Sequence, residues 1–132
     1  MNTLVLIANI LVFLAFLIHT FIGDKELKVN QPDNQDDPNF IKQEKWTMAR
    51  CGWHWVSVDL LLASVILALV NFSDFLSDER LVLQLLSLYF FVYAIAWILT
   101  IFISKSFPKN YLKLGQWLLL FIIALLLFFS IY

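Results

Sequence analysis

The amino-acid sequence predicts an all-α integral membrane protein, folded as an antiparallel up-down bundle of four transmembrane helices in one domain over residues 1–132. Two observations lead to this prediction. The composition is 61% hydrophobic and 17% aromatic with only 14% charged residues, which is outside the range of soluble globular domains. Four windows are also long and apolar enough to cross roughly 30 Å of hydrocarbon. They cover about residues 3–22, 52–72, 81–104 and 111–132.

The first window is interpreted as a retained helix rather than a secretory signal. It has no Lys or Arg before it, is too long for the apolar region of a signal, and lacks a small-x-small cleavage site. Residues 23–46 then form a predicted polar loop, because Pro32 and clusters of Asn and Asp favour turns. The first turn of this loop, DKEL, is free to continue the preceding helix, since no proline stands before Pro32.

The two remaining links, NFSDFLSDER and SKSFPKNY, are short. Short links place consecutive helices antiparallel, as in an up-down bundle. Eight of the nine Lys and Arg residues fall between the first and second or between the third and fourth windows or at their edges, and Arg80 alone lies on the other side. Positive residues in short loops stay cytoplasmic, so both termini are predicted to be extracytoplasmic.

Polar residues of three predicted helices fall at one membrane face. His19 lies near the end of the first helix, His54 near the start of the second, and Gln116 near the start of the fourth. Because consecutive helices run in opposite directions, these positions have matched depth. His19, Gly23 and Glu26 share one helical face by their i, i+4, i+7 spacing.

The second helix carries a similar stripe, formed by Arg50 and His54. A bundle must turn such stripes inward, because a polar group facing hydrocarbon has no partner. Asp59 lies deeper, about 10 Å below the interface by helical rise, where a carboxylate needs a partner or a proton.

Two imidazoles and a carboxylate are ligands that first-row divalent metals prefer, so His19, Glu26 and His54 are the predicted metal ligands. His19 and His54 could equally be the axial ligands of haem b. Covalent haem attachment is excluded because there is no C-x-x-C-H, and the sole cysteine, Cys51, excludes a cluster of thiolates. The alternative is that each histidine is only a hydrogen-bonded helix residue near the interface. The predicted supporting residues are Gly23, Arg50, Trp53, Asp59, Gln116 and Trp117.

Three short motifs carry a resemblance: H-x-x-x-G-x-x-E at residues 19–26, W-H at 53–54 and Q-W at 116–117. With them the chain resembles a group of small four-helix bacterial membrane proteins of unassigned function. The resemblance implies that His19, Gly23, Glu26, His54 and Gln116 work together, and that the protein belongs to a bacterial inner membrane.

Three functions remain open at this point. The first is a metal- or haem-binding protein with its site near the cytoplasmic face. The second is an accessory or assembly subunit of a larger membrane complex. The third is a small oligomeric transporter, ranked last because the small multidrug exporters carry an acidic residue in the middle of their first helix and this chain does not. The expected partners are the lipid bilayer and further copies or other membrane proteins, with no role for nucleic acid.

Overall fold

The computed structural model describes residues 1–33, 40–104 and 110–132, and every element assigned in these ranges is a helix. In chain order the elements are α1 (Thr3–Leu17), the π-helix η1 (Ile18–Gly23), α2 (Asp24–Val29), α3 (Ile41–Phe72), α4 (Glu79–Ser104), α5 (Asn110–Lys113) and α6 (Gln116–Phe129). The all-α prediction is therefore confirmed.

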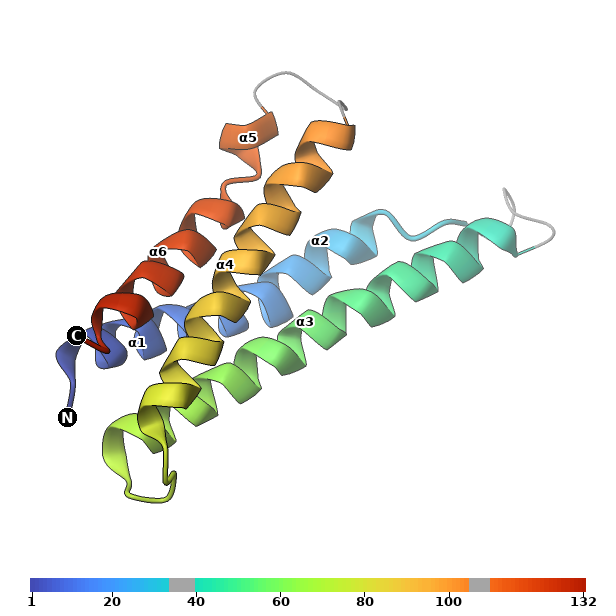
Figure 1. Ribbon diagram of the computed structural model, residues 1–132. Coiled ribbons are helices and arrows are strands. Elements are labelled where there is room, and N and C mark those ends of the chain that lie inside the picture. The colour runs from blue at the N-terminus through green and yellow to red at the C-terminus, as the bar shows by residue number, and fades with distance from the viewer. Residues whose placement is uncertain (34–39, 105–109) are drawn as a thin grey trace. The chain divides into compact units, whose positions relative to one another are not determined.

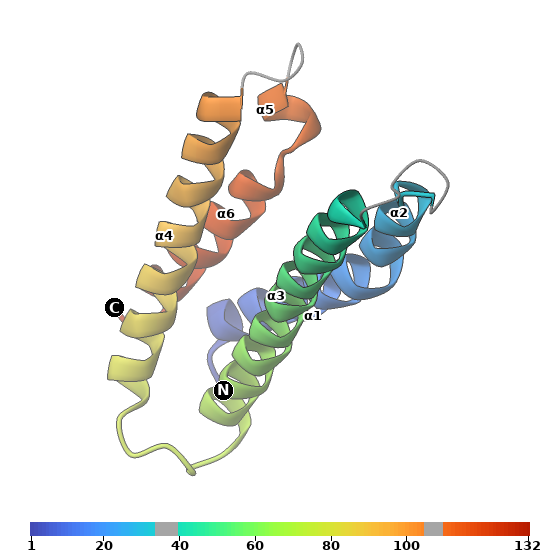
Figure 2. The same ribbon diagram turned by 90° about the vertical axis from the view of Figure 1, so that its right-hand side faces the viewer.

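The chain divides into two compact units. Unit 1 comprises residues 1–11 and 66–132, and unit 2 comprises residues 12–65. Each unit contains an antiparallel pair of helices (Figures 1 and 2). How four helices would assemble into one bundle goes beyond these two units and stays a prediction.

Unit 2 is a hairpin in which the end of α1, η1 and α2 form one arm and α3 as far as Val65 forms the other. Contacts run from His19–Trp53 through Asp24–Arg50 to Leu27–Trp46, so the residue number rises in one arm as it falls in the other. The hairpin is longer than the sequence predicted. The first arm continues to Val29, as the DKEL turn suggested, and α3 begins at Ile41 rather than near residue 52.

Unit 1 is centred on the antiparallel pair α4 and α6. Ser87 Oγ donates to the Ala124 carbonyl at 2.9 Å, and the Trp97 indole donates to the Leu114 carbonyl at 3.1 Å. The face of α4 that meets α6 includes small residues such as Ser87 and Ala94, both buried. Small residues let two helix backbones approach closely, which is how helices pack in lipid.

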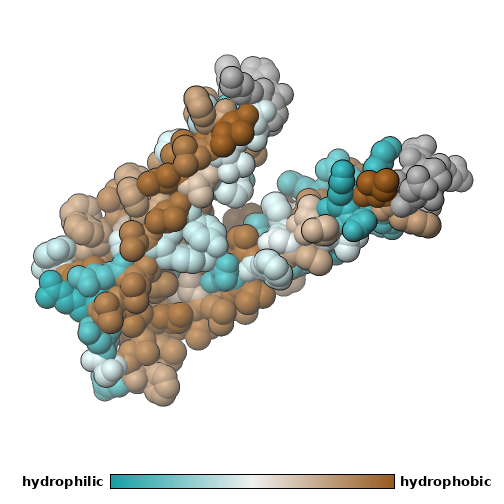
Figure 3. Space-filling view, turned by 45° about the vertical axis from the view of Figure 1, so that its right-hand side comes forward, coloured by the Kyte–Doolittle hydropathy of each residue, from teal (hydrophilic) through white to brown (hydrophobic). Residues whose placement is uncertain are grey.

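Three helical stretches are long and apolar enough to span a membrane, namely Thr3–Val29, Ile41–Phe72 and Glu79–Ser104. Large apolar side chains such as Leu62, Leu88 and Phe102 are exposed along them, as expected for surfaces that face lipid. Brown, hydrophobic atoms accordingly cover much of the view in Figure 3. These features support integration into a membrane.

The fourth predicted span differs from the others. The helix that was expected over residues 111–132 is broken into α5 and α6 by a turn at Leu114 and Gly115. At 14 residues, α6 is about 21 Å long at 1.5 Å per residue, short of the hydrocarbon thickness. The break is tolerated because indole donors satisfy carbonyls that the turn frees: Trp97 bonds to Leu114, and Trp117 bonds to Tyr111 at 3.0 Å.

Candidate functional site

The site begins at the π-helix, which separates the apolar α1 from the polar α2. A π-helix closes its hydrogen bonds at i→i+5 instead of i→i+4, and such turns are frequent at functional sites. Residues five apart therefore come to the same side. After η1, Asp24 rather than the expected Glu26 meets Arg50 and His54 of α3.

His19 and Trp53 hold each other through two reciprocal hydrogen bonds. His19 Nε2 donates to the Trp53 carbonyl at 3.0 Å, and the Trp53 indole Nε1 donates to the His19 carbonyl at 2.9 Å. The two rings stack in parallel, with their centroids 4.0 Å apart and an interplanar angle of 8°. The imidazole is thus fixed in both position and orientation.

Gly23 makes this close approach of the two arms possible. It is buried, and a Cβ atom at this position would clash with the six-membered ring of Trp53. Gly52, next to Trp53 in the sequence, has open space where its Cβ would be. Only Gly23 is therefore required by packing.

Asp24 is the buried centre of the charged part of the site. Its two oxygens accept from Arg50 Nε at 2.7 Å and from Arg50 Nη2 at 2.9 Å, the bidentate geometry that suits guanidinium and carboxylate. Lys28 Nζ lies 3.1 Å from Oδ2, and His54 Nε2 lies 3.3 Å from Oδ1. One carboxylate thus gathers basic groups from both arms of the hairpin.

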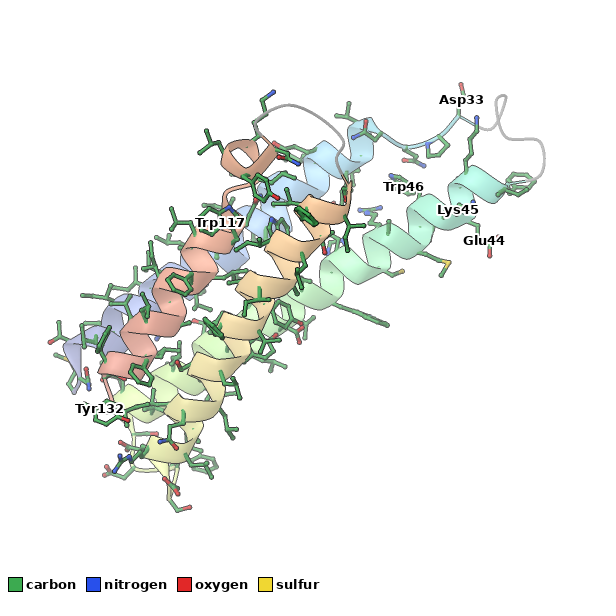
Figure 4. The ribbon with its side chains drawn as sticks, turned by 45° about the horizontal axis from the view of Figure 1, so that its top comes forward. Asp33, Glu44, Lys45, Trp46, Trp117 and Tyr132 are labelled. Carbon is green, nitrogen blue, oxygen red and sulfur yellow. The ribbon has the colours of Figure 1, made fainter. Side chains whose placement is uncertain are left out.

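The water-facing side of the cluster is closed by Trp46. Its indole donates to the Leu27 carbonyl at 3.2 Å, and the Arg50 guanidinium lies over its ring, 5.5 Å from the centroid. Figure 4 shows Trp46 on α3 close to the end of α2, with Glu44 and Lys45 beside it. Teal, hydrophilic atoms gather at the same end of the hairpin in Figure 3. The site therefore lies where the apolar part of the hairpin gives way to its polar end.

The two histidines are held through the same ring nitrogen. A carbonyl oxygen can only accept, so the 3.0 Å bond to Trp53 places a proton on His19 Nε2. The Asp24 carboxylate likewise favours a proton on His54 Nε2 at 3.3 Å. In the neutral imidazoles this leaves each Nδ1 as a lone pair, and within the described residues neither Nδ1 has a hydrogen-bond partner.

The three-ligand metal site predicted from the sequence is not formed. Among residues 1–33, 40–104 and 110–132, no three His, Cys, Asp or Glu side chains gather closely enough to hold a metal ion. Glu26 is exposed rather than turned into the site. The physical reason is the π-helix: the i, i+4, i+7 face assumed a continuous α-helix, and η1 breaks that period.

Three other predicted site residues lie elsewhere. Gln116 and Trp117 belong to unit 1, at the start of α6, so their membership of a site with His19 stays a prediction. Asp59 lies further along α3, where it is half-buried and has an interaction partner.

Sequence reasoning missed Asp24, the first residue of the DKEL turn, to which it gave no role in the site. A signal was nevertheless present. Arg50 was expected to face inward at the edge of a membrane helix, and a buried guanidinium requires an acidic partner. Asp24 was the nearest acidic residue to the apolar end of the opposite arm.

Comparison of the chain with protein-family models, with curated proteins and with solved structures finds no match.

Proposed function

We propose that this integral membrane protein binds a divalent transition-metal ion through Nδ1 of His19 and Nδ1 of His54. One observation carries the proposal: both imidazoles have Nε2 against an oxygen acceptor and Nδ1 uncommitted. Metal-ligating histidines almost always have this arrangement, in which the second nitrogen donates to a carboxylate or a backbone carbonyl. Here His19 has the backbone carbonyl and His54 has the carboxylate.

The surrounding residues would orient the ligands rather than coordinate the ion. Asp24 has both oxygens engaged by Arg50 and Lys28, so its role is to hold His54. Trp53 fixes the His19 ring from one face and from its edge. His19 and His54 stand on facing arms of the hairpin, where His19 bonds to the Trp53 carbonyl and His54 lies next to Trp53 in the sequence.

Two imidazoles leave coordination positions open. Water, a substrate, or residues from a second copy of the chain would fill them, and this is consistent with a homo-oligomer or a larger membrane complex. Haem b is the less favoured ligand, because Nδ1 is adjacent to the ring carbon that bears Cβ. Coordination through Nδ1 would press that part of the side chain against the flat porphyrin.

The alternative function is an accessory subunit, in which the same cluster is a structural clamp without a ligand. The observation in its favour is that these residues already hydrogen-bond in pairs without a ligand, Asp24 with Arg50 and His19 with Trp53. A transporter finds less support, since α1 contains no acidic residue.

We also infer a bacterial inner-membrane location with both termini outside the cytoplasm and an even number of crossings. The Asn2 side chain donates to the Ser130 carbonyl at 2.9 Å, so the two ends of the chain meet in unit 1. The excess of Lys and Arg in the loops at the other ends of the helices favours a cytoplasmic location for those loops.

Metal analysis of the full-length protein in detergent tests the metal proposal. We expect stoichiometric Zn²⁺ or Co²⁺, with a visible Co²⁺ spectrum that changes when either histidine is replaced. His19→Gln is the informative variant, because its amide can still donate to the Trp53 carbonyl while the ligand is lost. Affinity should fall at least about 100-fold in His19→Gln and His54→Gln, and about 10- to 100-fold in Asp24→Asn through the lost orientation of His54.

Glu26→Gln and Trp55→Phe are the matched controls, because both residues are exposed in unit 2. Both should bind the metal as the unaltered protein does. Absence of stoichiometric metal from the unaltered protein would support the structural clamp instead. A Soret band in the visible spectrum would show that the protein binds haem instead of a metal ion.

A further inference from the structure

A pocket of about 360 Å³ opens at one end of unit 1. It lies where α3 ends and α4 begins, next to the start of α1 and the residues that follow α6. Because α3 and α4 are candidate membrane spans that end here, the pocket is at the depth of the lipid head groups. Its lining residues belong to unit 1, whereas His19 and His54 belong to unit 2, so it does not depend on the metal proposal.

Asn71 is one of the residues that line this pocket, and it carries a buried donor. Only 8% of the residue is exposed. Its Oδ1 accepts from the Asn2 backbone N–H at 2.7 Å, so the other half of its side chain is the amide NH₂ group. That nitrogen is buried and has no hydrogen-bond partner among the described residues. An unsatisfied buried donor is costly, and a ligand with an acceptor oxygen would remove the cost.

Two charged side chains line the pocket, one of each sign. Arg80 and Glu79 both line it and both are exposed. Adjacent residues on a helix do not face each other, so each can address a different part of a ligand. Val5, Val70 and Leu83 complete the lining with apolar surface.

We propose that this pocket binds the head group of a zwitterionic aminophospholipid, such as phosphatidylethanolamine. The phosphate oxygens would accept from Asn71 Nδ2 and from the Arg80 guanidinium, and the ammonium would pair with Glu79. The apolar lining would contact the first carbons of the glycerol and acyl chains. A phosphate alone would satisfy Asn71 and Arg80 but would be repelled by Glu79, and this charge pattern favours the zwitterion.

Native mass spectrometry of the full-length protein with phosphatidylethanolamine, phosphatidylglycerol or phosphatidylcholine tests the proposal. We expect phosphatidylethanolamine to be retained best. Asn71→Asp keeps the oxygen that accepts from Asn2 while replacing the donor, so retention of this lipid should fall about tenfold or more. Arg80→Gln should have a similar effect.

Glu79→Gln separates a specific site from a damaged fold. The variant should retain less phosphatidylethanolamine, because the partner of the ammonium is lost. It should retain more phosphatidylglycerol, because the phosphate contacts remain and the repelling carboxylate is gone. A misfolded variant would lose both lipids. Lys25→Gln, in unit 2, is the control for a change of one surface charge and should alter neither.

Two results would overturn the proposal. Equal retention of all three lipids, unchanged in Asn71→Asp, would show that no head group is recognised. Complete displacement of phosphatidylethanolamine by millimolar inorganic phosphate would show a site for a free oxyanion.

Discussion

At the scale of single residues, the close contact between the two arms of unit 2 depends on the packing of Trp53 against Gly23. The Trp53 indole lies against Gly23, stacks on His19 and donates to its carbonyl. Four further interactions, all centred on Asp24, continue the cluster toward the polar end of the hairpin. The geometry of the histidine is therefore decided by a glycine four residues away.

Gly23→Ala should lower the stability of the protein by about 1–3 kcal/mol, the usual cost of overpacking a well-packed contact. The added methyl group must displace the Trp53 indole, which also loses its bond to the His19 carbonyl. Thermal unfolding in detergent measures the effect. Gly52→Ala is the matched control, because nothing lies near its Cβ. That variant should be neutral or gain up to about 1 kcal/mol from helix propensity. Equal behaviour of the two variants would contradict the packing described here.

At the scale of elements, the helices depart from ideal spans at two places. The π-helix η1 changes the face on which the following residues lie and so replaces Glu26 by Asp24. The turn between α5 and α6 shortens the last apolar helix, and two tryptophan indoles satisfy the carbonyls beside it. Irregular backbone is tolerated at membrane depth only when such partners are present.

Asp59→Leu tests the charged residue that lies deepest in α3. Insertion of this helix should become more favourable, since a central Asp costs about 2.5–3.5 kcal/mol on insertion scales and Leu does not. The folded protein should lose its Asp59 interaction, so the melting temperature should fall even as insertion improves. An insertion assay and thermal unfolding measure the two effects separately. Raised thermal stability with unchanged metal binding would mark Asp59 as dispensable.

At the scale of the whole molecule, the described structure consists of two helical units with apolar outer surfaces, and three stretches are able to cross a membrane. The bond between Asn2 and Ser130 brings the start and the end of the chain together. From the distribution of Lys and Arg we predict that both lie outside the cytoplasm.

Topology reporters fused at Tyr132 and within the segment between α2 and α3 should give opposite results. The C-terminal fusion should be active only as an extracytoplasmic reporter, and the fusion after Val29 only as a cytoplasmic one. A C-terminal fusion active only in the cytoplasm would reverse the orientation and open the His19 and His54 site to the other side of the membrane.

The sequence by itself determined the class of this protein and the part of the chain that contains the site. Its apolar windows indicated the helices, because a stretch of about twenty apolar residues in lipid must satisfy its own backbone hydrogen bonds, and a helix does so within one segment. Matched depth on consecutive antiparallel helices pointed to His19 and His54, and both lie in the cluster of unit 2.

Only the tertiary structure decided which carboxylate joins them. Helical periodicity selected Glu26, but the π-turn interrupts that periodicity. Beside it, Trp53 lies against Gly23 and Arg50 binds Asp24, which are contacts between residues far apart in the sequence. The same holds for the break before α6, where the Trp97 indole of a neighbouring helix satisfies the freed carbonyl of Leu114. Sequence periodicity assumes a regular α-helix. Where a helix is irregular, the backbone and side chains are bonded by residues far apart in the sequence, which periodicity does not show.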